Sequence, residues 1–198
     1  MDSCWNKRLQ GWDSIGGRLS TDTRFVMPRS FLICLAAITA LVALWGCDTR
    51  GEQSEFAAQA LSGPDGFTQT DENGEIIGAE DPDDWRTAPL YEGRVIVEPA
   101  FPNPVQAGET ITIGVNLLGF QGVPQGIRID ALRSDGQQTF EVERRSDIDS
   151  DGFFPITLNL FAATGEEGLT RVLLFDLGRG SIVSYGDVMI EAADSTDE

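Results

Sequence analysis

The clearest metal-binding pattern in the sequence is a set of three aspartates at alternate positions. Asp147, Asp149 and Asp151 occur in the run DIDSDG, which ends in a glycine. Calcium takes about six to eight oxygen ligands, and alternate carboxylates can converge on one ion when the backbone wraps around it. An EF-hand also needs a bidentate glutamate at the twelfth position of the loop, and that position is Leu158 here. A weak calcium loop and a solvated acidic turn both remain open, and we favour the turn.

Composition excludes several kinds of catalytic site. The chain has no histidine, which rules out Ser-His-Asp and Cys-His catalysis and any histidine-ligated metal. Its only lysine is Lys7, near the N-terminus. Pairs of carboxylates could perform acid–base hydrolysis, but acidic residues occur throughout, so no particular pair stands out. We therefore expect a protein that is not an enzyme, and a carboxylate hydrolase is the weakest hypothesis.

The net charge argues against one class of partner. The 198 residues include 32 acidic and 14 basic side chains, for a formal charge of −18. Binding of a phosphate backbone requires clustered Lys and Arg, so we expect no nucleic acid partner. Five basic and three acidic residues precede Cys47, whereas nine arginines and 29 acidic residues follow it. The part after Cys47 is therefore acidic and has no lysine, which predicts that salt stabilises the fold by screening its self-repulsion.

An apolar run near the N-terminus predicts export. Residues 31–45 are apolar except for Thr39, and Arg24 and Arg29 precede them. The run is shorter than the stretch of about 20 residues that a transmembrane helix needs, and it has the length of the apolar region of a secretion signal. Translation from Met27 would give a compact signal, so we expect that the true start is Met27.

The end of this run resembles a bacterial lipobox, Leu44-Trp45-Gly46-Cys47. The resemblance implies cleavage between Gly46 and Cys47, attachment of acyl chains such as palmitate to Cys47, and stable anchoring in a membrane. It places the protein at the cell membrane or outer membrane, facing the periplasm or the cell surface. Cys4 and Cys34 lie in the leader, so the processed chain would have no disulfide.

The segment that follows has the composition of a disordered tether. Between Asp48 and Glu92 there are twelve acidic residues against Arg50 and Arg86. One-sided charge with low hydrophobicity predicts an extended, disordered linker over residues 47–91. Trp85 is the exception, and we expect it to dock on the following domain and cover an edge strand, the alternative being an exposed tryptophan.

From residue 92 onward, apolar residues alternate as in β-strands. The clearest case is the stretch 111–117, in which Ile and Val alternate with Thr, Gly and Asn. Seven short strands are predicted from this periodicity, beginning near Val95, Thr110, Ile127, Phe140, Phe154, Arg171 and Ser181. The pattern predicts an all-β fold, a single seven-stranded immunoglobulin-like sandwich over residues 92–192, with a disordered tail at 193–198.

The segment Phe101-Pro102-Asn103-Pro104 and the strand after it resemble the opening of known envelope β-sandwiches. These are the sorting domains of Bacteroidetes-type secretion and the immunoglobulin-like domains of the flagellar hook cap. The resemblance implies the sandwich fold. It does not extend to the sorting role, because the chain ends in acidic residues, whereas the sorting domains end in basic ones.

Together these features predict an envelope protein with a leader at residues 1–46, a lipid anchor at Cys47, and one domain. The domain is expected to be noncatalytic and to serve adhesion or assembly with an envelope protein or a glycan. The alternative is a small calcium- or carbohydrate-binding module of an envelope complex, with calcium as its cofactor.

Overall fold

The computed structural model describes residues 49–119, 125–133, 136, 138–148 and 150–193. These described residues all belong to one compact unit. The expected signal sequence, with Gly46 and Cys47, lies outside the described residues. Within the described part of the chain, no helix is both long and apolar enough to cross a membrane.

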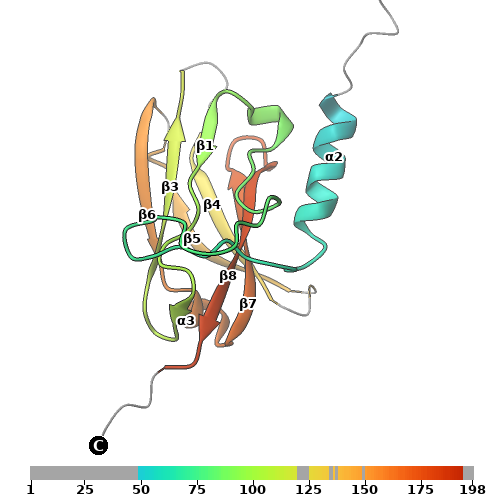
Figure 1. The fold of residues 1–198 in the computed structure, drawn as a ribbon. Coiled ribbons are helices and arrows are strands. Elements are labelled where there is room, and N and C mark those ends of the chain that lie inside the picture. Colours follow the sequence, from blue (N-terminus) through green and yellow to red (C-terminus); the bar gives the residue numbers. More distant parts are fainter. Residues whose placement is uncertain (1–48, 120–124, 134–135, 137, 149, 194–198) are drawn as a thin grey trace, which may run out of the picture. The chain divides into compact units, whose positions relative to one another are not determined.

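The domain is mostly β, as the sequence predicts, and has two sheets (Figure 1). One sheet has three strands in the order β1-β3-β6, and the other has five in the order β2-β8-β7-β4-β5. The strands are β1 (Val95–Val97), β2 (Val105–Gln106), β3 (Ile111–Leu117), β4 (Ile127–Leu132), β5 (Thr139–Arg145), β6 (Gly152–Leu158), β7 (Gly168–Asp176) and β8 (Ile182–Glu191). All pairings are antiparallel except that of β2 with β8.

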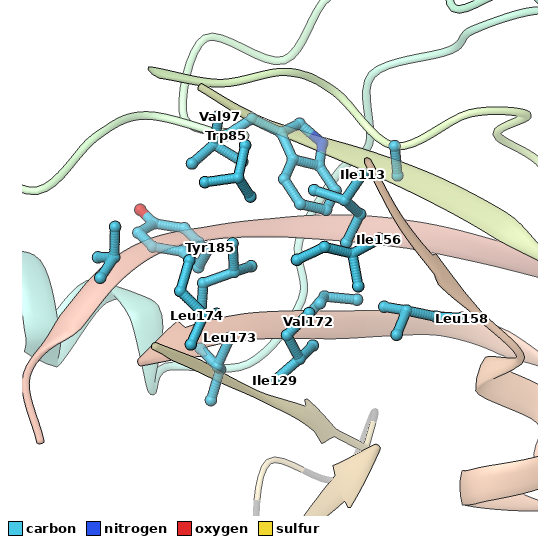
Figure 2. Packing of buried hydrophobic residues seen from close by; sticks show 14 of the residues in the cluster. Trp85, Val97, Ile113, Ile129, Ile156, Leu158, Val172, Leu173, Leu174 and Tyr185 are labelled. Carbon is cyan, nitrogen blue, oxygen red and sulfur yellow. The ribbon is translucent and has the colours of Figure 1, made fainter. Parts of the chain in front are cut away.

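The hydrophobic core lies between the two sheets. Alternate residues of β3, such as Ile113 and Val115, are fully buried, because side chains two apart on a strand share one face. They pack with β7, where Val172 and Leu174 are also fully buried. Figure 2 shows Ile113, Val172 and Leu174 with Trp85, which belongs to neither sheet and packs in the same core.

Two details of the strand prediction are wrong. The structure has an eighth strand, β2, which is only two residues long and therefore shows no alternation in the sequence. Leu160 does not extend the β6 strand but begins the short helix α3 (Leu160–Thr164). The side chain of Asn159 accepts a hydrogen bond from the backbone N–H of Ala162, and this N-cap ends the strand and starts the helix.

The segment expected to be a disordered tether is ordered, and this prediction is wrong for residues 49–91. We call residues 49–94 the N-terminal strap. The strap begins with helix α2 (Thr49–Ala60) and ends with the 3-10 turn η1 (Pro89–Tyr91) before β1. Phe56 of α2 is buried, with its ring 5.1 Å from the ring of Tyr185 on β8. The charge count failed as a predictor because several of the acidic side chains bind groups of the chain itself, as described below.

Trp85 confirms the expectation that it docks on the sheets. Its side chain is only 5% exposed, and its backbone N–H donates to the carbonyl of Tyr185 at 2.7 Å. The N–H of Ala88 likewise donates to the carbonyl of Val183. These bonds occupy the edge of β8 that the short β2 leaves unpaired. Gly186 makes this approach possible, because a Cβ at that position would overlap the indole of Trp85.

Candidate functional site

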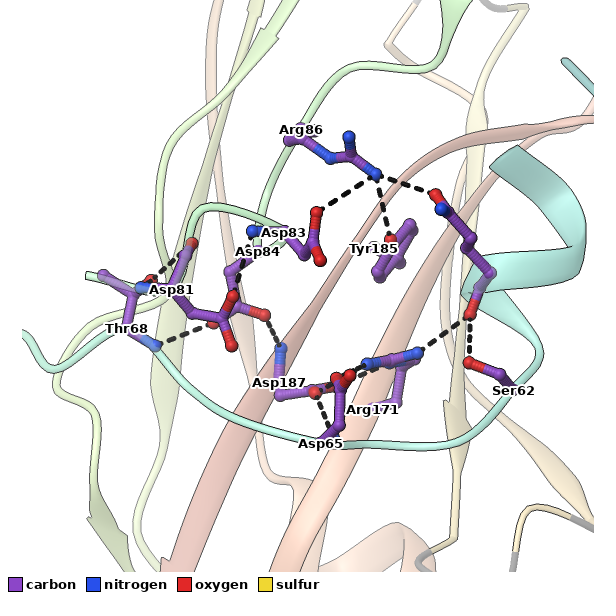
Figure 3. Close-up of polar contacts among 11 residues, drawn as sticks. Ser62, Asp65, Thr68, Asp81, Asp83, Asp84, Arg86, Arg171, Tyr185 and Asp187 are labelled. Atoms are coloured by element: carbon purple, nitrogen blue, oxygen red, sulfur yellow. Dashed lines mark hydrogen bonds and ion pairs between the residues drawn. The ribbon is translucent and has the colours of Figure 1, made fainter. Parts of the chain in front are cut away.

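A buried arginine, Arg171 on β7, joins the strap to the sheets. Its guanidinium donates from Nε and Nη2 to the two carboxylate oxygens of Asp187 on β8, at 2.7 and 2.8 Å. Nη2 also donates to Asp65 at 2.8 Å, and Nη1 donates to the backbone carbonyl of Gln59 at 3.0 Å. The side chains of Arg171 and Asp187 are 3% and 1% exposed. Figure 3 shows this arrangement, which we call the Arg171 network.

Two further aspartates of the strap belong to the same region (Figure 3). The carboxylate of Asp84 accepts the backbone N–H groups of Thr68 and Asp187, at 2.7 and 2.8 Å. Asp81 stands beside it, and its own backbone N–H donates to the hydroxyl of Thr68. Four acidic side chains therefore lie close to a single arginine. Hydrogen bonds from backbone N–H groups partly offset the repulsion among these carboxylates.

Burial sets the ionisation of this region. Desolvation raises the pKa of Asp84 to about 7, although two backbone hydrogen bonds favour its charged form. The neighbouring charge of Asp187 raises it further. Desolvation also raises the pKa of Asp187, opposed by the hydrogen bonds and charge of Arg171. With a pKa of about 7, the carboxyl group of Asp84 should change its protonation near neutral pH.

The segment Phe101–Pro104, singled out from the sequence, connects to the same region through Asn103. This side chain is fully buried and donates to the carbonyls of Thr68 and Asp187, both at 3.0 Å. Its side-chain oxygen accepts the backbone N–H of Met189 at 3.0 Å. The asparagine thus fastens the strap to β8, and every bond it makes is to the backbone.

Sequence reasoning missed the Arg171 network, although a signal for it exists. Arg171 and Asp187 lie within the two longest strands, β7 and β8, where a charged residue is rarely buried without a partner. Opposite charges in adjacent buried strands could have suggested a pair. The contribution of Asp65 could not have been found, because it lies 106 residues away in a segment that showed no periodicity.

The predicted calcium loop receives no support from the described residues. Asp149 lies outside them. Asp147 forms a bidentate pair with Arg145, at 2.8 and 2.6 Å, and these hydrogen bonds hold the pKa of Asp147 below its usual range. Ile148 is fully buried and its carbonyl accepts the N–H of Gly126, so the loop turns inward at that point. Calcium binding by Asp147 would require its ion pair with Arg145 to break.

An open groove of about 380 Å³ lies between β5, the end of β6 and α3. Its lining includes Glu141 and Glu143 from β5 and apolar residues such as Leu158. Glu141 is paired with Arg144. None of the residues that line the groove belongs to the Arg171 network. Among the described residues, no group of three histidine, cysteine or acidic side chains is placed to hold a metal ion.

Comparison with known proteins adds little to this geometry. The chain matches no protein-family profile and no curated protein. One solved structure with partial similarity is the Pseudomonas fluorescens alkylpurine DNA glycosylase AlkC bound to DNA containing an abasic site analogue. The TM-score is 0.34 at 16% identity, over 51% of this chain and 31% of the glycosylase chain. A likeness this weak carries no argument about fold or function.

Proposed function

We propose that the protein is a lipid-anchored cell-envelope protein with a noncatalytic domain that binds an envelope protein or a glycan. The observation that carries this proposal is the apolar run 31–45 ending in Leu44-Trp45-Gly46-Cys47.

We infer also that the domain is immunoglobulin-like. In such sandwiches strands A, B and E share one sheet, and strands C, F and G share the other. Here β1, β3 and β6 form the first set in chain order, and β4, β7 and β8 form the second. β5 lies beside β4, as strand C′ lies beside strand C in variable-type domains. This strand order supports the inference, and immunoglobulin-like domains commonly act as binding modules at cell surfaces.

The proposed noncatalytic role agrees with the internal pairing of the buried charged groups. The donors of Arg171 and both carboxylate oxygens of Asp187 have partners within the chain. Both oxygens of Asp84 also accept backbone N–H groups. These bonds hold the strap in place.

The test is the fate of Cys47 when the full chain is produced in a bacterial host. We expect the protein in the membrane fraction, with a mass that begins at Cys47 and includes acyl chains. The matched control is Cys47→Ser, which removes the acceptor thiol and should leave the protein without lipid. Wild-type protein of unmodified mass in the soluble fraction would contradict the proposal.

A binding partner is then sought by crosslinking in intact cells, with the Cys47→Ser variant as the reference. We expect one envelope protein or glycan to be captured by the anchored protein. Exposure of the domain at the cell surface would be tested by protease treatment of intact cells.

A further inference from the structure

Helix α2 ties the proposed lipid anchor closely to the domain. The helix begins at Thr49, and Gln53 in its second turn bonds to β8 and to another part of the strap. Its side-chain amide donates to the carbonyl of Ile182 on β8 and accepts the N–H of Leu90 in η1, both at 3.1 Å. Consecutive α-carbons are about 3.8 Å apart, so the α-carbon of Cys47 is within about 8 Å of that of Thr49.

The first turn of α2 lies at one end of the domain, where β3 ends and β1 begins (Figure 1). At this end the N–H of Leu118, just after β3, donates to the carbonyl of Arg94, just before β1, at 2.7 Å. The turn between β7 and β8 reaches the same end, since Phe175 pairs with Ile182. We call the anchor-side end the surface formed by Arg50, Leu90, Arg94, Leu118 and Arg179.

The anchor-side end carries exposed arginine and leucine side chains together with two exposed acidic residues, Glu52 and Glu92. The two leucines and three arginines that define it are all exposed. Among the described residues, no carboxylate lies within ion-pair distance of Arg50 or Arg94, whereas the arginines at positions 86, 128, 133, 144, 145 and 171 each have such a partner. Arg179 is 4.0 Å from Asp176. Exposed arginine beside exposed leucine suits the boundary between lipid headgroups and acyl chains.

We propose that the anchor-side end rests on the bilayer surface. The domain is held there because only Asp48 separates Cys47 from the start of α2. The proposal rests on the proposed function, because it requires lipid on Cys47. It specifies the lipid surface as a second partner, bound by arginine to anionic headgroups and by leucine at the interface. The opposite end, where β7 begins and β8 ends, then faces away from the membrane and remains open to other proteins.

The experiment uses the full chain, processed in a bacterial host and reconstituted in vesicles of phosphatidylethanolamine and phosphatidylglycerol. Cleavage removes Cys4 and Cys34, and lipid blocks Cys47, so an introduced cysteine is the only free thiol. A fluorophore is attached at Leu118→Cys or Leu90→Cys, and at the exposed Glu167→Cys as the matched control beyond the start of β7. Ten residues of β8 separate the two ends by about 33 Å.

The readout is quenching by lipids that carry a spin label on the headgroup. We expect severalfold stronger quenching at positions 118 and 90 than at 167. Insertion of about 20 Gly and Ser residues before Thr49 would add a flexible reach of about 25 Å, and the difference should then shrink.

The outcomes separate the two proposals. Lipidated protein with equal quenching at both ends, or stronger quenching at position 167, would overturn the orientation and leave the lipid anchor standing. If the difference in quenching between the two ends is unchanged by the Gly and Ser insertion, the short link between Cys47 and Thr49 does not set the orientation. A mass without acyl chains on Cys47 would overturn both the anchor and the orientation.

Discussion

The N-terminal strap and the two-sheet body meet on β8, and each is held by a different kind of side chain. The body is held by apolar residues between the sheets, such as Ile113 and Val172, which are fully buried. The strap contributes only a few apolar residues, chiefly Phe56, Trp85 and Tyr91. Its other attachments are hydrogen bonds and ion pairs that converge on Arg171 and Asp187.

This difference shows how a segment with the composition of a disordered linker can be ordered. Composition rules assume that acidic side chains repel one another and stay in water. In the strap, Asp84 accepts two backbone N–H groups and Asp65 binds Arg171, so these two carboxyl groups serve as attachments. A few buried aromatic residues supply the apolar contact that the rest of the segment lacks.

The largest expected effect comes from removing the buried arginine. Arg171→Met leaves Asp187 buried without its partner and releases Asp65, so we expect a loss of about 3–5 kcal/mol in the free energy of unfolding. Urea denaturation measures this loss. The matched control is Arg144→Met on β5. The pair of Arg144 with Glu141 is half-exposed, so its loss should matter little. Equal effects of the two changes would show that the strap does not depend on the Arg171 network.

A smaller effect is expected where the strap packs on β8. Gly186→Ala places a methyl group where the indole of Trp85 lies, and overpacking of this kind costs about 1–3 kcal/mol. The free energy of unfolding should be measured also for Trp85→Ala and for the double variant. If the indole is the cause, Gly186→Ala should cost much less in the Trp85→Ala background. Strict additivity of the two changes would contradict the contact.

The pH dependence of the strap should follow Asp84. Its folded-state pKa of about 7 lies above the ordinary value of 3.8, so between these pH values the folded protein holds a proton that the unfolded chain releases. The contribution of Asp84 to stability is therefore present below about pH 4 and is lost as the pH rises toward 7. Titration of its carboxyl carbon by NMR measures the pKa, and a midpoint near 4 would contradict this account. In Asp84→Asn, this part of the pH dependence should disappear.

Salt should stabilise the protein by screening the repulsion among its acidic residues. We expect the melting temperature to rise with sodium chloride, by about 2–4 °C for each kcal/mol of relieved repulsion in a chain of this size. Thermal unfolding followed by circular dichroism measures the shift. A melting temperature that does not change with salt would mean that the internal pairing already compensates the excess charge.

The smallest effect is expected from calcium. Asp147 is bound to Arg145, so millimolar calcium should leave the melting temperature unchanged. Asp147→Asn provides the control, since it removes a candidate ligand. A rise with calcium in the wild type that is absent in Asp147→Asn would restore the calcium-binding alternative.

The parts of the fold that sequence reasoning recovered are those with local periodicity. Alternation over 111–117 predicted β3, and the apolar run beginning at Arg171 predicted β7. Docking of Trp85 was also expected, because burying a large aromatic ring away from water lowers the free energy of the folded state. The partners of Asp65, Asp84 and Asn103 were not recovered, since each bond joins segments far apart in the chain.

The sequence by itself determined the all-β class, the exclusion of histidine chemistry and the expectation of a lipid anchor at Cys47, because each depends on residue type and local spacing. Only the tertiary structure decided that the strap is ordered and that Arg171 and Asp187 form its fastening. The physical reason is that a carboxylate is stabilised by whichever donors surround it. Those donors come from β7, β8 and the strap together, and only folding brings them within hydrogen-bond distance.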